Sequence, residues 1–196
     1  MEERKLNEKE SLELISQMIR NTQQKLVRGN GAPFLIWGYV TITVSLTIWF
    51  LLGKTGDYRW NYLWFLIPLF GYPLMLFFTK ERERRVKTYL DKVISYVWIA
   101  FGFAGFAVSI VAMFYWRLHL PILFIVVLLM SVGTAITGLI IQFKPIAFSG
   151  FAAIVLSPVC LLLKGHDAIL IFALMFLLMM VIPGHFLTYK NRKSNV

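Results

Sequence analysis

The chain has 196 residues, of which 58% are hydrophobic and 15% are charged, and its formal net charge is +10. Soluble domains are about 45–50% apolar and about 25% charged, so this composition excludes an ordinary soluble domain. The charges are segregated and leave uncharged apolar runs long enough to cross a bilayer as helices. A single cysteine, Cys160, excludes an internal disulfide.

Residues 1–32 are charged and polar, so we expect no cleaved signal peptide. Asn7 and Glu10 have the spacing of a capping box, which predicts a helix from about residue 8 to the Gly29-Asn30-Gly31 stop. Its apolar residues fall on one face, so the helix is predicted to be amphipathic. The candidate partner contacts at its heptad a and d positions are Leu12, Ile15, Ile19 and Leu26.

This helix has three interpretations. It lies on the inner leaflet, packs under the membrane bundle, or binds a protein, with a helical dimer as one form of binding. Its mixed charge favours packing or partner binding over simple adsorption to lipid.

Six apolar runs follow, and each predicts a transmembrane helix because backbone groups in hydrocarbon must hydrogen-bond internally. The predicted spans are 34–52, 60–79, 93–116, 120–143, 145–163 and 168–189. Prolines predict an interruption of the second span, a kink at Ser157-Pro158 and a break near Pro183-Gly184. Residues 33–189 are therefore expected to form one bundle of three hairpins, followed by a basic tail at 190–196.

Basic residues predict the orientation of this bundle. An even number of spans places both ends on one side, where 16 of the 20 Lys and Arg residues fall, including six in the polar stretch 80–92. The positive-inside rule then puts both termini in the cytoplasm, and we expect a bacterial cytoplasmic membrane. An anionic inner leaflet accounts for the positive charge, so no nucleic-acid partner is expected.

No pattern in the chain indicates catalysis, a cofactor or a metal. The turn histidines His119 and His166 come singly from separate loops, whereas a metal site needs converging ligands. The six spans contain no Asp, Glu, Lys or Arg, which argues against an ion-driven carrier and against hydrolysis by paired carboxylates. His185 is the one ionisable group within a span, and it is either a transport or sensing residue or an interfacial histidine near Tyr189.

Two functions remain. The first is a non-enzymatic regulatory or accessory subunit that binds a protein partner, or a second copy of itself, through cytoplasmic contacts. These contacts combine the N-terminal helix with Arg82, Arg84 and Arg85. The alternative is a passive or partner-energised transporter of a neutral or lipophilic small molecule. Its candidate lining is Thr41, Ser45, Thr134, Thr137, Ser157 and His185, although buried hydroxyls also serve helix packing.

Overall fold

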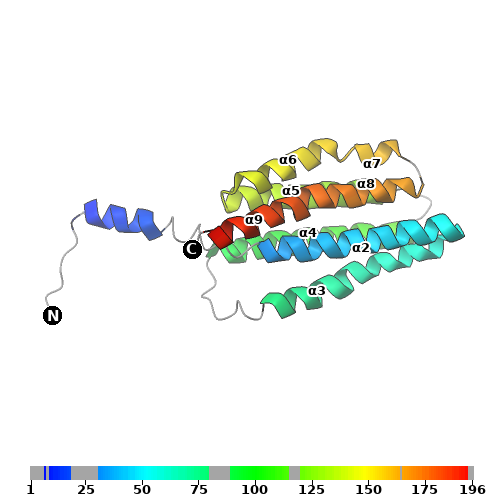
Figure 1. Ribbon diagram of the computed structural model, residues 1–196, viewed down its shortest axis with the longest axis horizontal. Coiled ribbons are helices and arrows are strands. Elements are labelled where there is room, and N and C mark those ends of the chain that lie inside the picture. Colours follow the sequence, from blue (N-terminus) through cyan, green and yellow to red (C-terminus); the bar gives the residue numbers. More distant parts are fainter. Residues whose placement is uncertain are drawn as a thin grey trace.

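The computed structural model describes residues 7, 9–18, 31–79, 89–114, 120–163 and 165–193. Within this part, six helical segments are long and apolar enough to cross a membrane, and each overlaps one predicted span. The described residues contain no strand. The expected all-α, six-span membrane protein is therefore confirmed at the level of helix type and number (Figure 1).

The elements follow the order of the six spans. The first four spans are α2 (Gly31–Thr55), the 3₁₀ segment η1 (Tyr58–Phe65) with α3 (Leu66–Thr79), α4 (Tyr89–Phe114) and α5 (Ile122–Ile140). The fifth is α6 (Lys144–Leu156) with α7 (Val159–Leu162), and the sixth is α8 (Asp167–Phe176), the π turn η4 (Leu177–Val181) and α9 (Ile182–Lys193).

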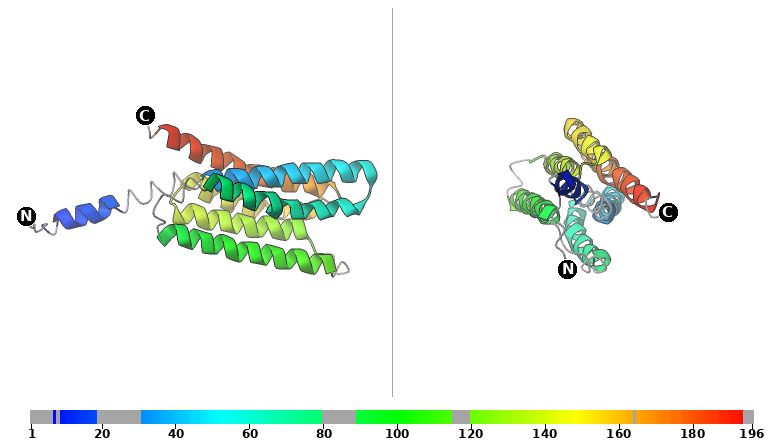
Figure 2. Two further views of the ribbon diagram at one scale, coloured as in Figure 1. Left: turned by 90° about the horizontal axis from the view of Figure 1, so that it is seen from below. Right: turned by 90° about the vertical axis from the view of Figure 1, so that its left-hand side faces the viewer.

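Burial separates the spans into inner and outer helices. The sixth span has 56% of its most apolar window buried, whereas the second and third spans have 6% each. α2 packs along α8, η4 and α9, and α5 packs along α6. α3 packs on α2 and α4 packs on α5, and both lie at the edge of the bundle in the end-on view of Figure 2.

Glycines allow the inner helices to approach closely. A Cβ on Gly138 would collide with the backbone of Ala147, and one on Gly150 would collide with the backbone of Ala135. α5 and α6 are therefore in backbone contact at two points. Lipid is as apolar as the side chains, so it provides no hydrophobic driving force for helix association. Van der Waals packing between closely spaced small residues stabilises such crossings instead.

Proline distorts the sixth span earlier than expected. Helix α9 continues through Pro183 and Gly184, so the break predicted there is wrong. The distortion is the π turn one turn upstream, where the Ile182 N–H donates to the carbonyl of Leu177, five residues back. Proline cannot donate to the carbonyl four residues before it and clashes with that group, and widening the helix relieves the clash.

The other proline predictions have mixed outcomes. The fifth span bends where expected, because α6 ends at Leu156 and α7 begins after Pro158. In the second span, α3 runs through Pro73 without interruption. The irregular part is instead the 3₁₀ segment η1. Asp57 caps the start of this segment, where its side chain accepts a hydrogen bond from the Arg59 N–H.

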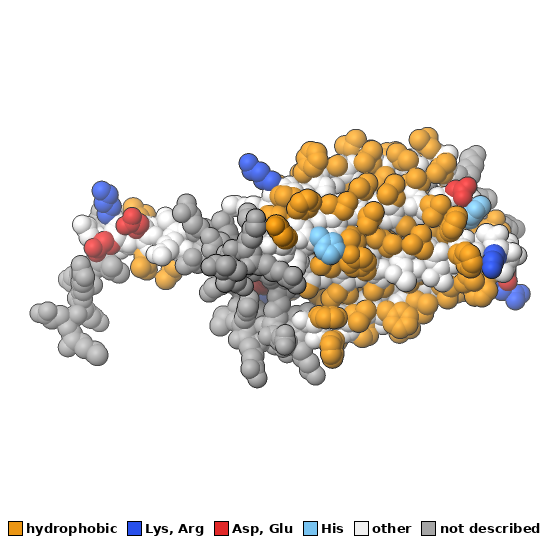
Figure 3. Space-filling model, in the orientation of Figure 1, with side chains coloured by type: hydrophobic (Ala, Val, Ile, Leu, Met, Phe, Trp, Pro, Cys, Tyr) orange, Lys and Arg blue, Asp and Glu red, His pale blue; other side chains and the backbone are white. Residues whose placement is uncertain are grey.

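The surface has the distribution expected of a membrane-spanning bundle. Apolar side chains cover the face shown in Figure 3, while charged side chains of the bundle gather at its two ends. The start of α2 and the end of α9 lie at the same end of the bundle (Figure 1). A multi-pass membrane protein is the class that this architecture defines.

Candidate functional site

The predicted polar lining does not face an open space in the part of the chain that the structure describes. Its five hydroxyl residues are all buried, with exposed fractions of 3% or less: Thr41, Ser45, Thr134, Thr137 and Ser157. The pocket found beside α2 is lined by none of them. They occupy the packed interior on α2, α5 and the end of α6.

Most of these hydroxyls are bonded within their own helices. Ser45 donates to the Thr41 carbonyl at 2.6 Å, Thr137 to Gly133 at 2.7 Å, and Ser157 to the backbone three residues back. Back-bonding of this kind satisfies the donor without a partner helix. Three of the five hydroxyls are thus bonded to carbonyls of their own chain segment, as is typical of hydroxyls that serve helix packing.

Thr137 and Thr134 are the two exceptions to purely local bonding. The indole Nε1 of Trp98 on α4 donates to Thr137 Oγ1 at 3.2 Å, so this hydroxyl also joins two spans. The Oγ1 of Thr134 is buried without a hydrogen-bond partner. The Nε1 of Trp49 on α2 is the other such buried atom among the described residues.

His185 lies apart from the buried hydroxyls, on the surface of α9. Its Nε2 is 2.7 Å from Tyr39 Oη, and the two rings meet edge to face with centroids 5.9 Å apart. The pair joins the first and sixth spans. Sequence reasoning did not place Tyr39 in a site, because the two positions are 146 residues apart and no local pattern relates them.

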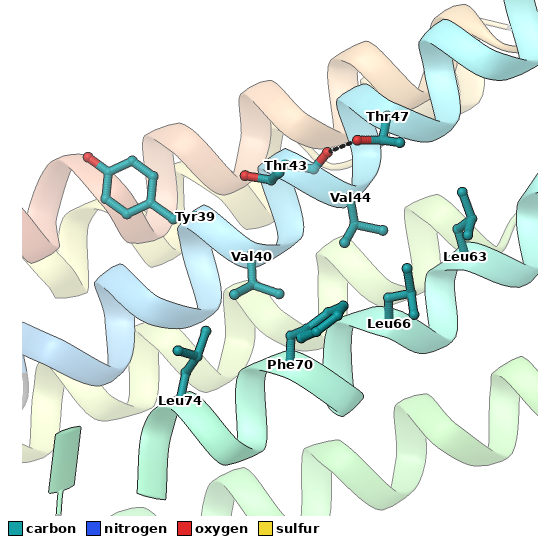
Figure 4. Close-up of a pocket in the computed structure, with 9 residues that line it drawn as sticks. All are labelled: Tyr39, Val40, Thr43, Val44, Thr47, Leu63, Leu66, Phe70 and Leu74. Carbon is teal, nitrogen blue, oxygen red and sulfur yellow. Dashed lines mark hydrogen bonds between the residues drawn. The ribbon is translucent and has the colours of Figure 1, made fainter. Parts of the chain in front are cut away.

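Tyr39 also lines a groove between α2 and α3 (Figure 4). The groove has a volume of about 390 Å³. Its α2 side consists of Tyr39, Val40, Thr43, Val44 and Thr47, and its other side of Leu63, Leu66, Phe70 and Leu74. Thr47 donates to the Thr43 carbonyl at 2.8 Å, and both threonines are exposed.

The partner-contact residues are only partly within the described chain. Residues 9–18 are helical and stand apart from the bundle in Figure 1. Leu12 is 66% exposed and Ile15 is 52% exposed on this helix. The other five candidates, Ile19, Leu26, Arg82, Arg84 and Arg85, lie outside the described residues, as does the rest of the predicted helix.

No metal cluster occurs in the described ranges, which contain no group of three or more His, Cys, Asp or Glu side chains placed to hold an ion. His166 is beside its neighbour, with 3.1 Å between its Nε2 and Asp167 Oδ1, and it stacks on Trp49 with ring centroids 6.3 Å apart. His119 is among the residues that the structure does not describe.

Comparison with known proteins adds no family to this picture. No protein-family model, curated protein or solved structure matches the chain.

Proposed function

We propose that this protein is a non-enzymatic accessory or regulatory membrane subunit that binds a protein partner through its N-terminal helix. The observation that carries the proposal is the exposed apolar face of the helix at residues 9–18. Leu12 and Ile15 lie three positions apart on it, and each has more than half of its surface exposed. Figure 3 shows apolar side chains on this helix beyond the end of the bundle.

An apolar helical face of this kind fits a groove or a partner helix. Helix-in-groove binding uses apolar anchors at spacings of three and four residues, and Leu12 and Ile15 have the first of these spacings. The interior supports the same function, because its hydroxyls are buried and mostly bonded to their own helices. A transporter lining would instead present such groups to its solute.

The finer architecture belongs to this proposal. The six spans form three hairpins, both termini face the cytoplasm of a bacterial cell, and the 80–92 stretch forms the second part of the contact surface. Sixteen basic residues on one side support this orientation, because basic residues near span ends are retained on the cytoplasmic side. The helix at residues 9–18 would then lie in the cytoplasm, where soluble or membrane-bound partners can bind it.

A deletion tests the proposal directly. Full-length protein and a variant lacking residues 1–28 are purified from native membranes in mild detergent, and co-purified proteins are quantified. We expect the deletion to remove at least one partner that the full chain retains. Leu12→Glu with Ile15→Glu is expected to have the same effect, whereas Gln17→Glu on the same helix retains the partner.

The result that would overturn the proposal is an unchanged set of co-purified proteins in the deletion and in the double variant. Melting temperatures of the bundle are measured in parallel. An unchanged melting temperature shows that a lost partner results from the missing helix and not from unfolding.

A further inference from the structure

We propose that the groove between α2 and α3 binds one acyl chain of a membrane phospholipid. Its volume of about 390 Å³ falls within the range of roughly 300–1,000 Å³ that is typical of small-molecule pockets. Of the nine residues that line it along two membrane spans, five are aliphatic, two are aromatic and two are threonines. This site is separate from the N-terminal helix.

The groove exists because α2 and α3 touch along one edge only. On the closed edge, Gly71 of α3 meets the ring of Trp37, where a Cβ would be 2.7 Å from a ring carbon. Further along, buried Val44 and Ile48 of α2 pack with Ile67 of α3. These contacts hold the helices together at the back of the groove.

The open edge has short side chains on the α2 side. Thr43 and Thr47 are one turn apart and exposed, and their small side chains leave space beside Phe70. Val40 and Val44 point toward the α3 side chains and form the floor (Figure 4). The result is a mostly apolar groove that is open on the α2–α3 surface of the described chain.

The surrounding bilayer determines the occupant. Tyr39 and Phe70, which are 48% and 52% exposed, make the groove continuous with the lipid-facing surface of both spans. The hydrocarbon core offers acyl chains and no water to fill such a space. The stretch from Tyr39 to Thr47 covers about 12 Å of helix, less than half of the roughly 30 Å core, so a chain from one leaflet is long enough.

The polar groups favour a phospholipid over a plain hydrocarbon. The Tyr39–His185 pair lies beside the groove toward the start of α2, and the exposed Thr43 lies one turn farther along. An ester carbonyl at the top of an acyl chain accepts hydrogen bonds from donors of these types. The chain would occupy the apolar part while its ester group meets these donors.

Photolabelling in vesicles tests this site. The full-length protein is reconstituted in phosphatidylglycerol and phosphatidylcholine vesicles containing a phosphatidylglycerol with a diazirine in one acyl chain, and labelled peptides are mapped by mass spectrometry. We expect the label to concentrate on the peptides carrying Thr43 and Phe70. Val40→Trp fills the groove and is expected to reduce this labelling at least fivefold.

Matched variants separate a filled groove from a damaged fold. Val155→Trp makes the same change on α6 at a position that is 77% exposed, and it should leave the groove labelling unchanged. Thr43→Phe narrows the open edge at an exposed position, so we expect the bundle to fold and the labelling to fall. A diazirine fatty acid without a headgroup is expected to label the groove more weakly than the phospholipid.

Three results would overturn the proposal. One is even labelling across all lipid-facing helices, which indicates bulk lipid contact only. Another is unchanged groove labelling in both Val40→Trp and Thr43→Phe. The third is stronger labelling by the free fatty acid than by the phospholipid, which would assign the site to a different amphiphile.

Discussion

The Ser149 hydroxyl on α6 lies 3.4 Å from the carbonyl oxygen of Met179, the carbonyl that Pro183 cannot reach with a backbone N–H. In an α-helix, the residue at position 183 would donate to position 179, and proline has no N–H to give. The same hydroxyl lies 3.0 Å from the Ile146 carbonyl of its own helix, so its single proton is shared and it replaces the missing backbone donor only in part. Such replacement is how membrane helices tolerate internal proline.

Met179 is held at its side chain as well. Its Sδ is 3.5 Å from the Ser131 hydroxyl of α5, and the residue is fully buried. Serines from two inner spans therefore contact the π turn, while each hydroxyl also has a closer acceptor in its own helix. Gly38 of α2 faces the same turn, where a Cβ would be 2.7 Å from a methyl carbon of Val181.

We predict that Ser149→Ala destabilises the bundle by about 0.6 kcal/mol, and by no more than about 1.7 kcal/mol, as for other hydrogen bonds between membrane helices. The loss should shrink in a Pro183→Ala background, because that variant restores a backbone donor for Met179. Unfolding free energies of the two single variants and the double variant, measured in bicelles, give the coupling directly. Ser109→Ala on outer helix α4 is the control, because Ser109 donates to Gly105 of its own helix at 2.8 Å. Equal costs in both backgrounds would contradict the assigned role of Ser149.

Hydropathy predicts the spans because each must supply about 20 apolar residues to the hydrocarbon core. It does not predict which face of a span is buried, since lipid is as apolar as the protein interior. Thr41 and Thr43 illustrate the consequence. They are two residues apart on α2, yet Thr41 is buried in the bundle and Thr43 lies on the open groove.

The Tyr39–His185 pair lay beyond sequence reasoning for a different reason. It depends on the packing of the first span against the sixth, and single-sequence patterns contain no information on that pairing. The proline positions were visible, but their effect depended on neighbours. Pro183 is accommodated by a π turn and a serine from α6, so the predicted break does not form.

Glycine at the α5–α6 crossing provides the second prediction. We expect Gly150→Ala to lower the free energy of unfolding by about 1–3 kcal/mol, because the added methyl group meets the backbone of Ala135 and cannot be accommodated by a rotamer change. Gly102→Ala on α4 is the matched control, since no atom lies within 4 Å of the position where its Cβ would be. Thermal unfolding in the same detergent compares the two variants. Equal melting temperatures would show that the crossing is not as tight as the structure indicates.

Trp98 gives the third prediction, because it attaches the outer helix α4 to two inner spans. Its Nε1 donates to Thr137, and its ring meets Phe34 of α2 edge to face with centroids 6.0 Å apart. Trp98 is only partly buried, so we expect Trp98→Ala to cost about 2–3 kcal/mol of unfolding free energy, below the roughly 3–5 kcal/mol of fully buried tryptophans. Trp98→Phe retains most of the ring contact and should cost about 1 kcal/mol.

The control for Trp98 is Tyr96→Ala on the same helix, at a residue that is 66% exposed. Chemical unfolding monitored by tryptophan fluorescence is unsuitable for variants that remove a tryptophan, so circular dichroism is the measurement. A cost for Tyr96→Ala as large as that for Trp98→Ala would indicate a general effect on α4 and would contradict the specific attachment.

The fourth prediction is the orientation of the bundle across the membrane. The distribution of basic residues indicates this orientation, whereas the helix packing is the same in either direction. Cys160 is 6% exposed within the bundle, so Cys160→Ala provides a background without a reactive thiol. In that background we expect Tyr58→Cys, in the segment after α2, to react with a membrane-impermeant maleimide applied to intact spheroplasts. Ser11→Cys, in the N-terminal helix, should react only after the membrane is permeabilised. The physical reason is the retention of 16 of 20 basic residues on the side of the N-terminal helix. The reverse labelling pattern would place that helix outside the cell and would remove the basis for a cytoplasmic partner.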